Sequence, residues 1–163
     1  MATSFVLLAK RSRYCPSVYS FTRLKSFVPY IPQAKDLWVL RHVIINLTML
    51  PLDRFREFIT ANDLFRDEDP ILLAVSGGRD SVLMAHFFHQ CGFRFGIAHC
   101  NFMLRGPEAM ADERFCRELA GQFGVPHFET RFETREFAEG HHVSIQMAAR
   151  ELRFGWLERI REE

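Results

Sequence analysis

Apolar and polar positions in residues 49–163 alternate between a pattern typical of buried strands and one typical of helices. Residues 71–75, Ile-Leu-Leu-Ala-Val, form an uninterrupted apolar run between turn residues. This run predicts a strand buried on both faces, as in a parallel sheet. Residues 82–91 are mostly apolar with helical spacing, and Gly92 is placed to end that helix. Strict alternation over residues 93–98 predicts a second strand that ends near His99.

The same pattern continues through the rest of the chain. Apolar residues recur at every fourth position up to Phe123, which predicts a helix that Gly124 ends. Residues 125–130 are expected to form a third strand, and a further helix is expected from about Ile145. A short amphipathic helix over about residues 52–62 precedes the first strand. Strand, helix and strand within about thirty residues form a right-handed βαβ unit, so the order predicts an α/β fold with a parallel sheet.

Composition narrows the class of protein. The chain has 163 residues, 48% of them hydrophobic and 25% charged, which fits an ordinary soluble domain. No apolar stretch approaches the ~20 residues of a membrane-spanning helix, so no membrane partner is expected. The four cysteines form no C-x-x-C pair, which argues against a zinc ribbon or a dithiol and favours buried free thiols: Cys15, Cys91, Cys100 and Cys116.

Charge divides the chain into two parts. Residues 1–48 hold seven Lys/Arg and one acid, a net +6, whereas residues 49–163 hold 14 basic and 19 acidic residues, a net −5. The basic segment has three interpretations: upstream sequence included by a wrong start, with Met49 as the true start, a transit-like peptide, or a genuine extension. The predicted location is accordingly cytoplasmic, or organellar if the basic segment is a transit peptide. In none of these interpretations does the basic segment carry chemistry, which is expected of residues 49–163.

The end of the chain carries no stop signal for its last helix. Neither a Gly cap nor a Pro is present, and the acids Glu162 and Glu163 occupy the last turn, where the helix dipole prefers bases. Three strands rarely complete an open parallel sheet. The sequence is therefore expected to be the truncated front of a longer domain.

The hexapeptide Ser76-Gly77-Gly78-Arg79-Asp80-Ser81 is the candidate chemical motif, at the point where a strand gives way to a helix. Two glycines let backbone N–H groups approach an anion, and the helix start adds unpaired donors and the positive end of its dipole. The loop therefore predicts a phosphate site. It is neither a Walker A loop nor a Rossmann G-x-G-x-x-G motif.

This hexapeptide resembles the S-G-G-x-D-S signature of the PP-loop ATP pyrophosphatases. Residues 98–108, with Asp112 and Glu113 after them, and residues 144–154 are similar to segments of one family in this superfamily, the tRNA(Ile)-lysidine synthetases. The resemblance implies that ATP adenylates the wobble cytidine in the anticodon loop of a minor isoleucine tRNA and releases pyrophosphate. Free L-lysine then displaces AMP to form lysidine.

The resemblance also implies roles for individual residues. Asp80 would position Mg²⁺, and it can at the same time be an acid favoured at a helix N-terminus by the dipole. Arg79 would contact phosphate or face solvent. His99 and Asn101 would line the adenosine pocket or cap a loop. Arg150 would hold a phosphate or the adenylate, the alternative being an exposed helical arginine paired with a nearby acid. The ATP loop itself would comprise Ser76, Gly77, Gly78, Arg79, Asp80 and Ser81.

The chain departs from the family pattern after this point. The family's next motif, a His-His pair followed by paired Asp, is absent, because Val143 and Ser144 follow His141-His142. The net −5 of residues 49–163 is also poorly suited to holding RNA phosphates unaided. We therefore expect that this chain does not complete catalysis by itself. Two other functions stay open, a PP-loop tRNA thiolase and a non-catalytic nucleotide-binding remnant. The oligomeric state is not predicted.

Overall fold

Three parallel strands form the centre of the sheet. The computed structural model describes residues 6–9, 19–20 and 51–162. The strand order is β2-β1-β3-β4-β5, with β3, β4 and β5 parallel and β1 antiparallel to both β2 and β3. The strands are β1 Val6–Ala9, β2 Tyr19–Ser20, β3 Ile71–Ala74, β4 Phe95–Asn101 and β5 His127–Arg131. The predicted parallel α/β sheet is confirmed, and the two antiparallel strands extend it.

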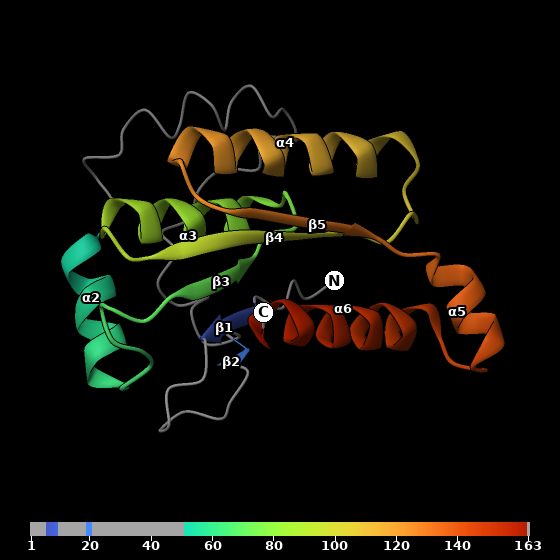
Figure 1. The fold of residues 1–163 in the computed structure, drawn as a ribbon, viewed down its shortest axis with the longest axis horizontal. Helices are drawn as coiled ribbons and strands as arrows, with labels where there is room; N and C mark the ends of the chain where they lie inside the picture. Colours follow the sequence, from blue (N-terminus) through green and yellow to red (C-terminus); the bar gives the residue numbers. More distant parts are fainter. Residues whose placement is uncertain (1–5, 10–18, 21–50, 163) are drawn as a thin grey trace.

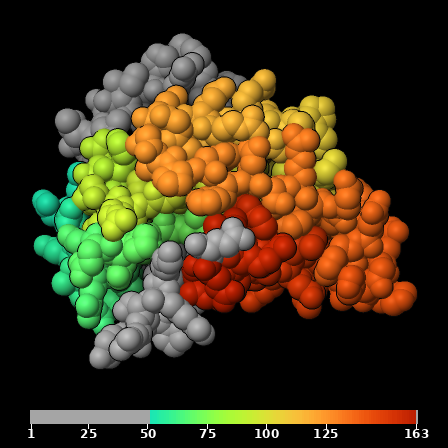
Figure 2. Space-filling model, viewed as in Figure 1, coloured from blue at the N-terminus to red at the C-terminus, as the bar shows by residue number. Residues whose placement is uncertain are grey.

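Helices cover both faces of the sheet. They are α2 Leu52–Ala61, α3 Arg79–Gln90, α4 Pro107–Phe123, α5 Thr134–Gly140 and α6 Ile145–Glu162. The crossover helices α3 and α4 lie on one face and α6 on the other (Figure 1). Two successive crossovers of the same hand that advance in one direction place their helices on the same side. In the space-filling view, the red surface of α6 lies between the green surface around β3 and the orange surface of α5 (Figure 2).

Alternate strand residues supply two separate cores. Ile71 and Leu73 belong to the larger cluster with α2, α3 and α4, whereas Leu72 packs with Leu157 of α6. Phenylalanines dominate the larger cluster, and the rings of Phe55 and Phe87 have centroids 4.8 Å apart. The larger cluster includes the buried rings of Phe55, Phe87, Phe88, Phe93 and Phe95. These rings form core rather than a platform for stacking bases.

Most predicted elements are confirmed, with two corrections. The second strand was expected over 93–98, but β4 begins at Phe95 and runs to Asn101, with nearly every residue buried. Small residues explain the misleading alternation: a Cβ on Gly96 would lie 3.3 Å from Pro126 O, so this position is packed rather than exposed. Helix α5 was not predicted at all.

No helix within the described ranges has the length and apolar content to cross a bilayer. Cys15 and the proposed start at Met49 lie outside the described residues. The other three cysteines, Cys91, Cys100 and Cys116, are free, as expected.

Candidate nucleotide-binding site

The loop between β3 and α3 requires glycine at its second position. Gly77 has φ +82°, a backbone conformation that side chains disfavour. A Cβ there would also lie 3.0 Å from both Cβ and Oδ1 of Asp112 on α4. Conformation and close approach therefore both select glycine, and the loop backbone lies directly against α4.

Serine hydroxyls close the loop on itself. Ser81 Oγ donates to the carbonyl of Gly78 at 2.8 Å and accepts from the Ser76 N–H at 3.2 Å. Ser76 Oγ accepts from the Gly78 N–H at 3.3 Å. Ser81 is only 3% exposed, so its hydroxyl shapes the loop instead of pointing outward as a free donor.

The start of α3 faces this loop. Gly78 is the N-cap, with an extended backbone and no side-chain cap. The first intrahelical bond runs from the Val82 N–H to Gly78 O at 3.1 Å. The N–H groups of the preceding turn lack helical acceptors by construction, and the dipole adds positive charge there. This end of α3 is therefore suited to an anion, as the motif predicted.

The carboxyl end of β4 supplies the next wall. His99 is buried, and its Nδ1–H donates to the carbonyl of Val75 at 2.8 Å, so Nε2 is the ring nitrogen left to meet a ligand. Cys116 Sγ lies 3.6 Å from the same carbonyl. The end of β3 is thus fixed from both β4 and α4.

Asn101 caps the loop that follows β4. Its Nδ2 donates to Glu113 Oε2 at 2.9 Å, and its Oδ1 accepts from the Met103 N–H at 2.9 Å. Of the two interpretations left open by the sequence, these contacts match loop capping. Asn101 also contributes to the wall of the cavity described next.

A cavity of about 530 Å³ opens over the phosphate loop, a volume within the range of small-ligand sites. It extends along the carboxyl ends of β3 and β4, where ligands bind in open α/β sheets. Its lining comprises Ala74, Val75, Ser76, Gly77, Gly78, Ser81, Ala98, His99, Cys100, Asn101, Phe102, Leu104, Arg105, Ala109, Asp112 and Arg153. Six of the nine predicted site residues therefore meet in one cavity.

The remaining three predicted residues lie outside this lining. Arg79 and Asp80 form an ion pair at 3.6 Å on the first turn of α3, with a third of the Asp80 side chain exposed. Arg150 is exposed on α6, with its guanidinium 5.4 Å from the centroid of Phe154.

Arg153, one turn after Arg150, is the arginine that reaches the cavity. Its guanidinium lies 5.5 Å from the ring centroid of Phe102. Its Nε is buried without a hydrogen-bond partner within the described part of the chain. A buried guanidinium nitrogen left unpaired indicates a missing acceptor, which an anionic ligand would supply. Arg153 follows Arg150 by three residues, about one helical turn, and this spacing was the feature of the sequence that could have pointed to it.

Asp112 and Arg105 also line the cavity and were not predicted as site residues. Burial raises the pKa of Asp112, and the nearby charges of His99 and Arg105 oppose that rise. Asp112 reaches the loop because α4 returns across it, a contact between residues far apart in the sequence.

The carboxylates fit a nucleotide-bound Mg²⁺ better than a protein-caged metal. Within residues 51–162, no three potential ligand side chains gather to hold an ion. Magnesium at phosphate sites commonly takes one or two carboxylates and completes its shell with phosphate oxygens and water. Asp80 on the first turn of α3 and Asp112 against Gly77 are donors of that kind.

The thiols near the cavity stay protonated. Burial raises the pKa values of Cys100 and Cys116 to about 12. A thiolate is the reactive form of cysteine, so neither group is poised for sulfur chemistry at neutral pH.

The histidines outside the site pack on aromatic rings or lie at the surface. His86 is buried edge-on to Phe123, with ring centroids 4.9 Å apart, and His89 stacks on the same ring at 4.4 Å. His141 and His142 are exposed.

A phosphate-binding loop at the end of a parallel strand, open to a cavity between β3 and β4, defines a nucleotide-binding α/β domain. The family model of an ATP-binding PP-loop domain matches residues 52–163. The chain therefore belongs to the PP-loop domain family, and the fold and superfamily expected from the hexapeptide are confirmed.

Curated relatives narrow the similarity further. The tRNA(Ile)-lysidine synthase of Bacteroides thetaiotaomicron is 44% identical over 110 residues, which cover 68% of this chain and 26% of the relative. The enzyme of the same name from Parabacteroides distasonis is 41% identical over 107 residues, 66% of this chain and 24% of the relative. The enzyme of that name from Thermus thermophilus is 38% identical over 96 residues, which cover 59% of this chain and 19% of the relative. The chain spans between about a fifth and a quarter of the length of these relatives.

Proposed function

We propose that this chain is the ATP-binding part of a tRNA(Ile)-lysidine synthetase. The observation that carries the proposal is the Ser76–Ser81 loop, which presents the start of α3 to the cavity, in a chain 44% identical to such an enzyme. In the first step, the C2 oxygen of the wobble cytidine attacks the α-phosphorus of ATP and pyrophosphate leaves. In the second step, an amine of free L-lysine attacks C2 and AMP leaves.

The loop and α3 hold the leaving pyrophosphate in this proposal. Backbone N–H groups in the first turn of α3 donate to phosphate oxygens, and the helix dipole adds to the attraction. Asp80, and Asp112 from the facing helix, would hold Mg²⁺. When bound, Mg²⁺ offsets the charge that develops on the leaving group.

Two arginines on α6 are assigned to the acidic part of the nucleotide. Arg153 donates to a phosphate or to the adenylate, because its buried Nε lacks an acceptor. Arg150 lies one helical turn before Arg153, at the exposed surface of α6. In this proposal it contacts a substrate that reaches the cavity from the α6 side. His99 contacts the adenosine through Nε2, and Asn101 shapes the adjoining loop.

The tRNA and lysine sites lie mainly beyond this part of the domain. Residues 49–163 carry a net −5, and the resemblance does not extend to the tRNA-binding regions of the family. We therefore assign recognition of the isoleucine tRNA anticodon loop to the remainder of the enzyme and place the reaction in the cytoplasm. The thiolase alternative is disfavoured by the protonated thiols of Cys100 and Cys116.

Isothermal titration of the full 163-residue chain with Mg-ATP tests the proposal. The wild type is expected to bind, and Asp80→Ala is expected to weaken the affinity roughly tenfold or more. Asp53→Ala is the matched control, since Asp53 is also an acid in the first turn of a helix but lies on α2. Equal binding by Asp80→Ala and wild type would contradict the role of Asp80, and no binding by wild type would contradict the proposal.

A second arm tests the reaction. The protein assayed is a fusion of this chain to the remaining part of a lysidine synthetase. With ATP, minor isoleucine tRNA and labelled L-lysine, it is expected to release pyrophosphate and to transfer the label to the tRNA. Release of pyrophosphate without lysine incorporation would contradict the ligase assignment.

A further inference from the structure

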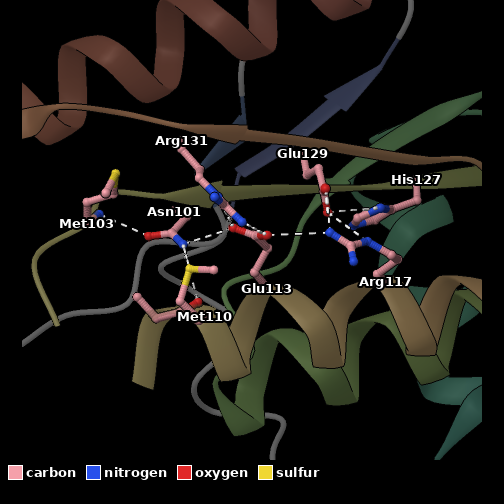
Figure 3. Close-up of polar contacts among 9 residues, drawn as sticks. Asn101, Met103, Met110, Glu113, Arg117, His127, Glu129 and Arg131 are labelled. Carbon is pink, nitrogen blue, oxygen red and sulfur yellow. Dashed lines mark hydrogen bonds and ion pairs between the residues drawn. The ribbon is translucent and has the colours of Figure 1, made fainter. Parts of the chain in front are cut away.

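A buried carboxylate joins the ends of two parallel strands beside the cavity. Glu113 of α4 is 4% exposed and points toward Asn101 on β4 and Arg131 on β5 (Figure 3). Its Oε2 accepts from Asn101 Nδ2 and Arg131 Nε, both at 2.9 Å. Its Oε1 accepts from Arg131 Nη2 at 2.8 Å and from Arg117 Nη2 at 3.4 Å.

These donors keep Glu113 ionised. Arg131 binds the carboxylate at two points, through Nε to Oε2 and through Nη2 to Oε1, which is the geometry of an arginine paired with an ionised carboxylate. An ionised carboxylate only accepts hydrogen bonds. Every polar group that faces Glu113 must therefore be a donor.

This requirement fixes the orientation of the Asn101 amide. Its Nδ2 must face Glu113, which turns Oδ1 toward the Met103 N–H at 2.9 Å. Met103 has φ +51°, an unfavourable conformation for a residue with a side chain. The bond to Asn101 therefore holds a strained turn. Glu113 is the nearest acceptor that orients the amide, and Ala109 O at 3.4 Å and Met110 Sδ at 3.7 Å are weaker acceptors on the same side.

The turn held in this way is a wall of the nucleotide cavity. Phe102, Leu104 and Arg105 line it, and Phe102 also lies against Arg153. Glu113 itself does not line the cavity. Its influence on a ligand passes through the amide and the loop.

We propose that Glu113 is a positioning residue for nucleotide binding, acting through Asn101 on the loop of residues 102–106. The identity of the ligand rests on the proposed function. The effect of Glu113 on the conformation of the loop rests on the hydrogen bonds alone.

Glu113→Gln is the informative variant, because it keeps the shape and replaces one acceptor by a donor. Arg131 faces both oxygens of Glu113, so the new NH₂ opposes Arg131 in either placement, and in the place of Oε2 it also opposes Asn101. The variant therefore removes the charged acceptor that orients the Asn101 amide. Glu129→Gln is the matched control, since Glu129 accepts from Arg117 in the same polar cluster and makes no bond to Asn101.

Two readouts on the full chain at pH 7 test the inference, the hydrogen exchange of single amides by NMR and the Kd for Mg-ATP. In Glu113→Gln, exchange of the Met103 amide is expected to accelerate about tenfold or more, and the Kd to rise about tenfold, the size of one lost hydrogen bond. The Ile97 amide, which donates to Pro126 O at 2.9 Å, is the internal reference and should exchange as in wild type. Glu129→Gln should change neither readout.

Three results would overturn the inference. They are unchanged exchange at Met103, equal acceleration at Met103 and Ile97, which would indicate general loosening, and a wild-type Kd despite a freed Met103 amide. If the wild type binds no ATP, the proposed function fails, and the Met103 amide alone decides whether Glu113 positions the loop.

Discussion

At Gly77, the local backbone conformation and the tertiary packing both favour glycine. Its positive φ disfavours side chains, and a Cβ there would fit only tightly, at 3.0 Å from Asp112. The hexapeptide could be predicted from sequence because the phosphate loop is built from neighbouring residues. Asp112 could not, since only the path of α4 brings it to the loop.

Substitution of Gly77 should separate these two demands. Gly92 has φ +71° and open space around its Cα, so Gly92→Ala is expected to cost about 1 kcal/mol of unfolding free energy and to leave ATP affinity unchanged. Gly77→Ala adds the clash with Asp112 and should weaken Mg-ATP binding about tenfold or more. Urea unfolding and calorimetric titration of both variants measure these effects.

Unaltered ATP binding by Gly77→Ala would show that the approach of α4 to the loop has no part in the site. A loss of binding by Gly92→Ala would show instead that backbone strain anywhere near α3 is sufficient.

Helix α6 is the element that completes the second face of the sheet and brings Arg153 to the cavity. Leu157 is fully buried against Leu72 and Ala98, one turn after Arg153. The helix was predicted from its apolar periodicity. The part of the sheet on which α6 packs was not predicted, because β4 presents small residues such as Ala98 to this helix and small residues give a weak hydrophobic pattern.

Leu157→Ala should lower the unfolding free energy by about 2–4 kcal/mol, through lost burial and the cavity left behind. Met147→Ala is the control on the same helix, since Met147 is 58% exposed, and should change it by less than about 0.5 kcal/mol. Denaturant titration compares the two. Similar values for both variants would contradict the packing of α6 on the sheet.

Helix α5 was missed because its sequence lacks a long apolar period. It spans only seven residues, and its start is held by a tertiary contact, the Thr134 hydroxyl donating to Phe102 O at 2.9 Å. This bond ties α5 to the same loop that Asn101 caps. A short helix fixed in this way depends on residues distant in the chain and is not visible to periodicity.

At the scale of the whole molecule, the parallel strands and their crossover helices could be predicted, because each is encoded by a contiguous run. The sheet order beyond β3 could not, since the antiparallel pairing of β1 depends on residues 62 or more positions away. Six of the nine predicted site residues meet in the cavity, because strand ends in a parallel sheet share one edge. The arginine that lines the cavity is Arg153 and not the predicted Arg150, because the two lie one helical turn apart on α6 and only the later one reaches the cavity.

The central claim is that ATP binds in this cavity with its phosphates on the loop at the start of α3. Titration of the full, isotope-labelled chain with Mg-ATP, followed by amide NMR, tests it most directly. The account predicts saturable shifts largest at the amides of Gly77 and Gly78, with Gly121 and Gly124 at the far end of α4 unchanged. Shifts confined to residues outside the cavity lining, or no shifts at saturating Mg-ATP, would contradict it.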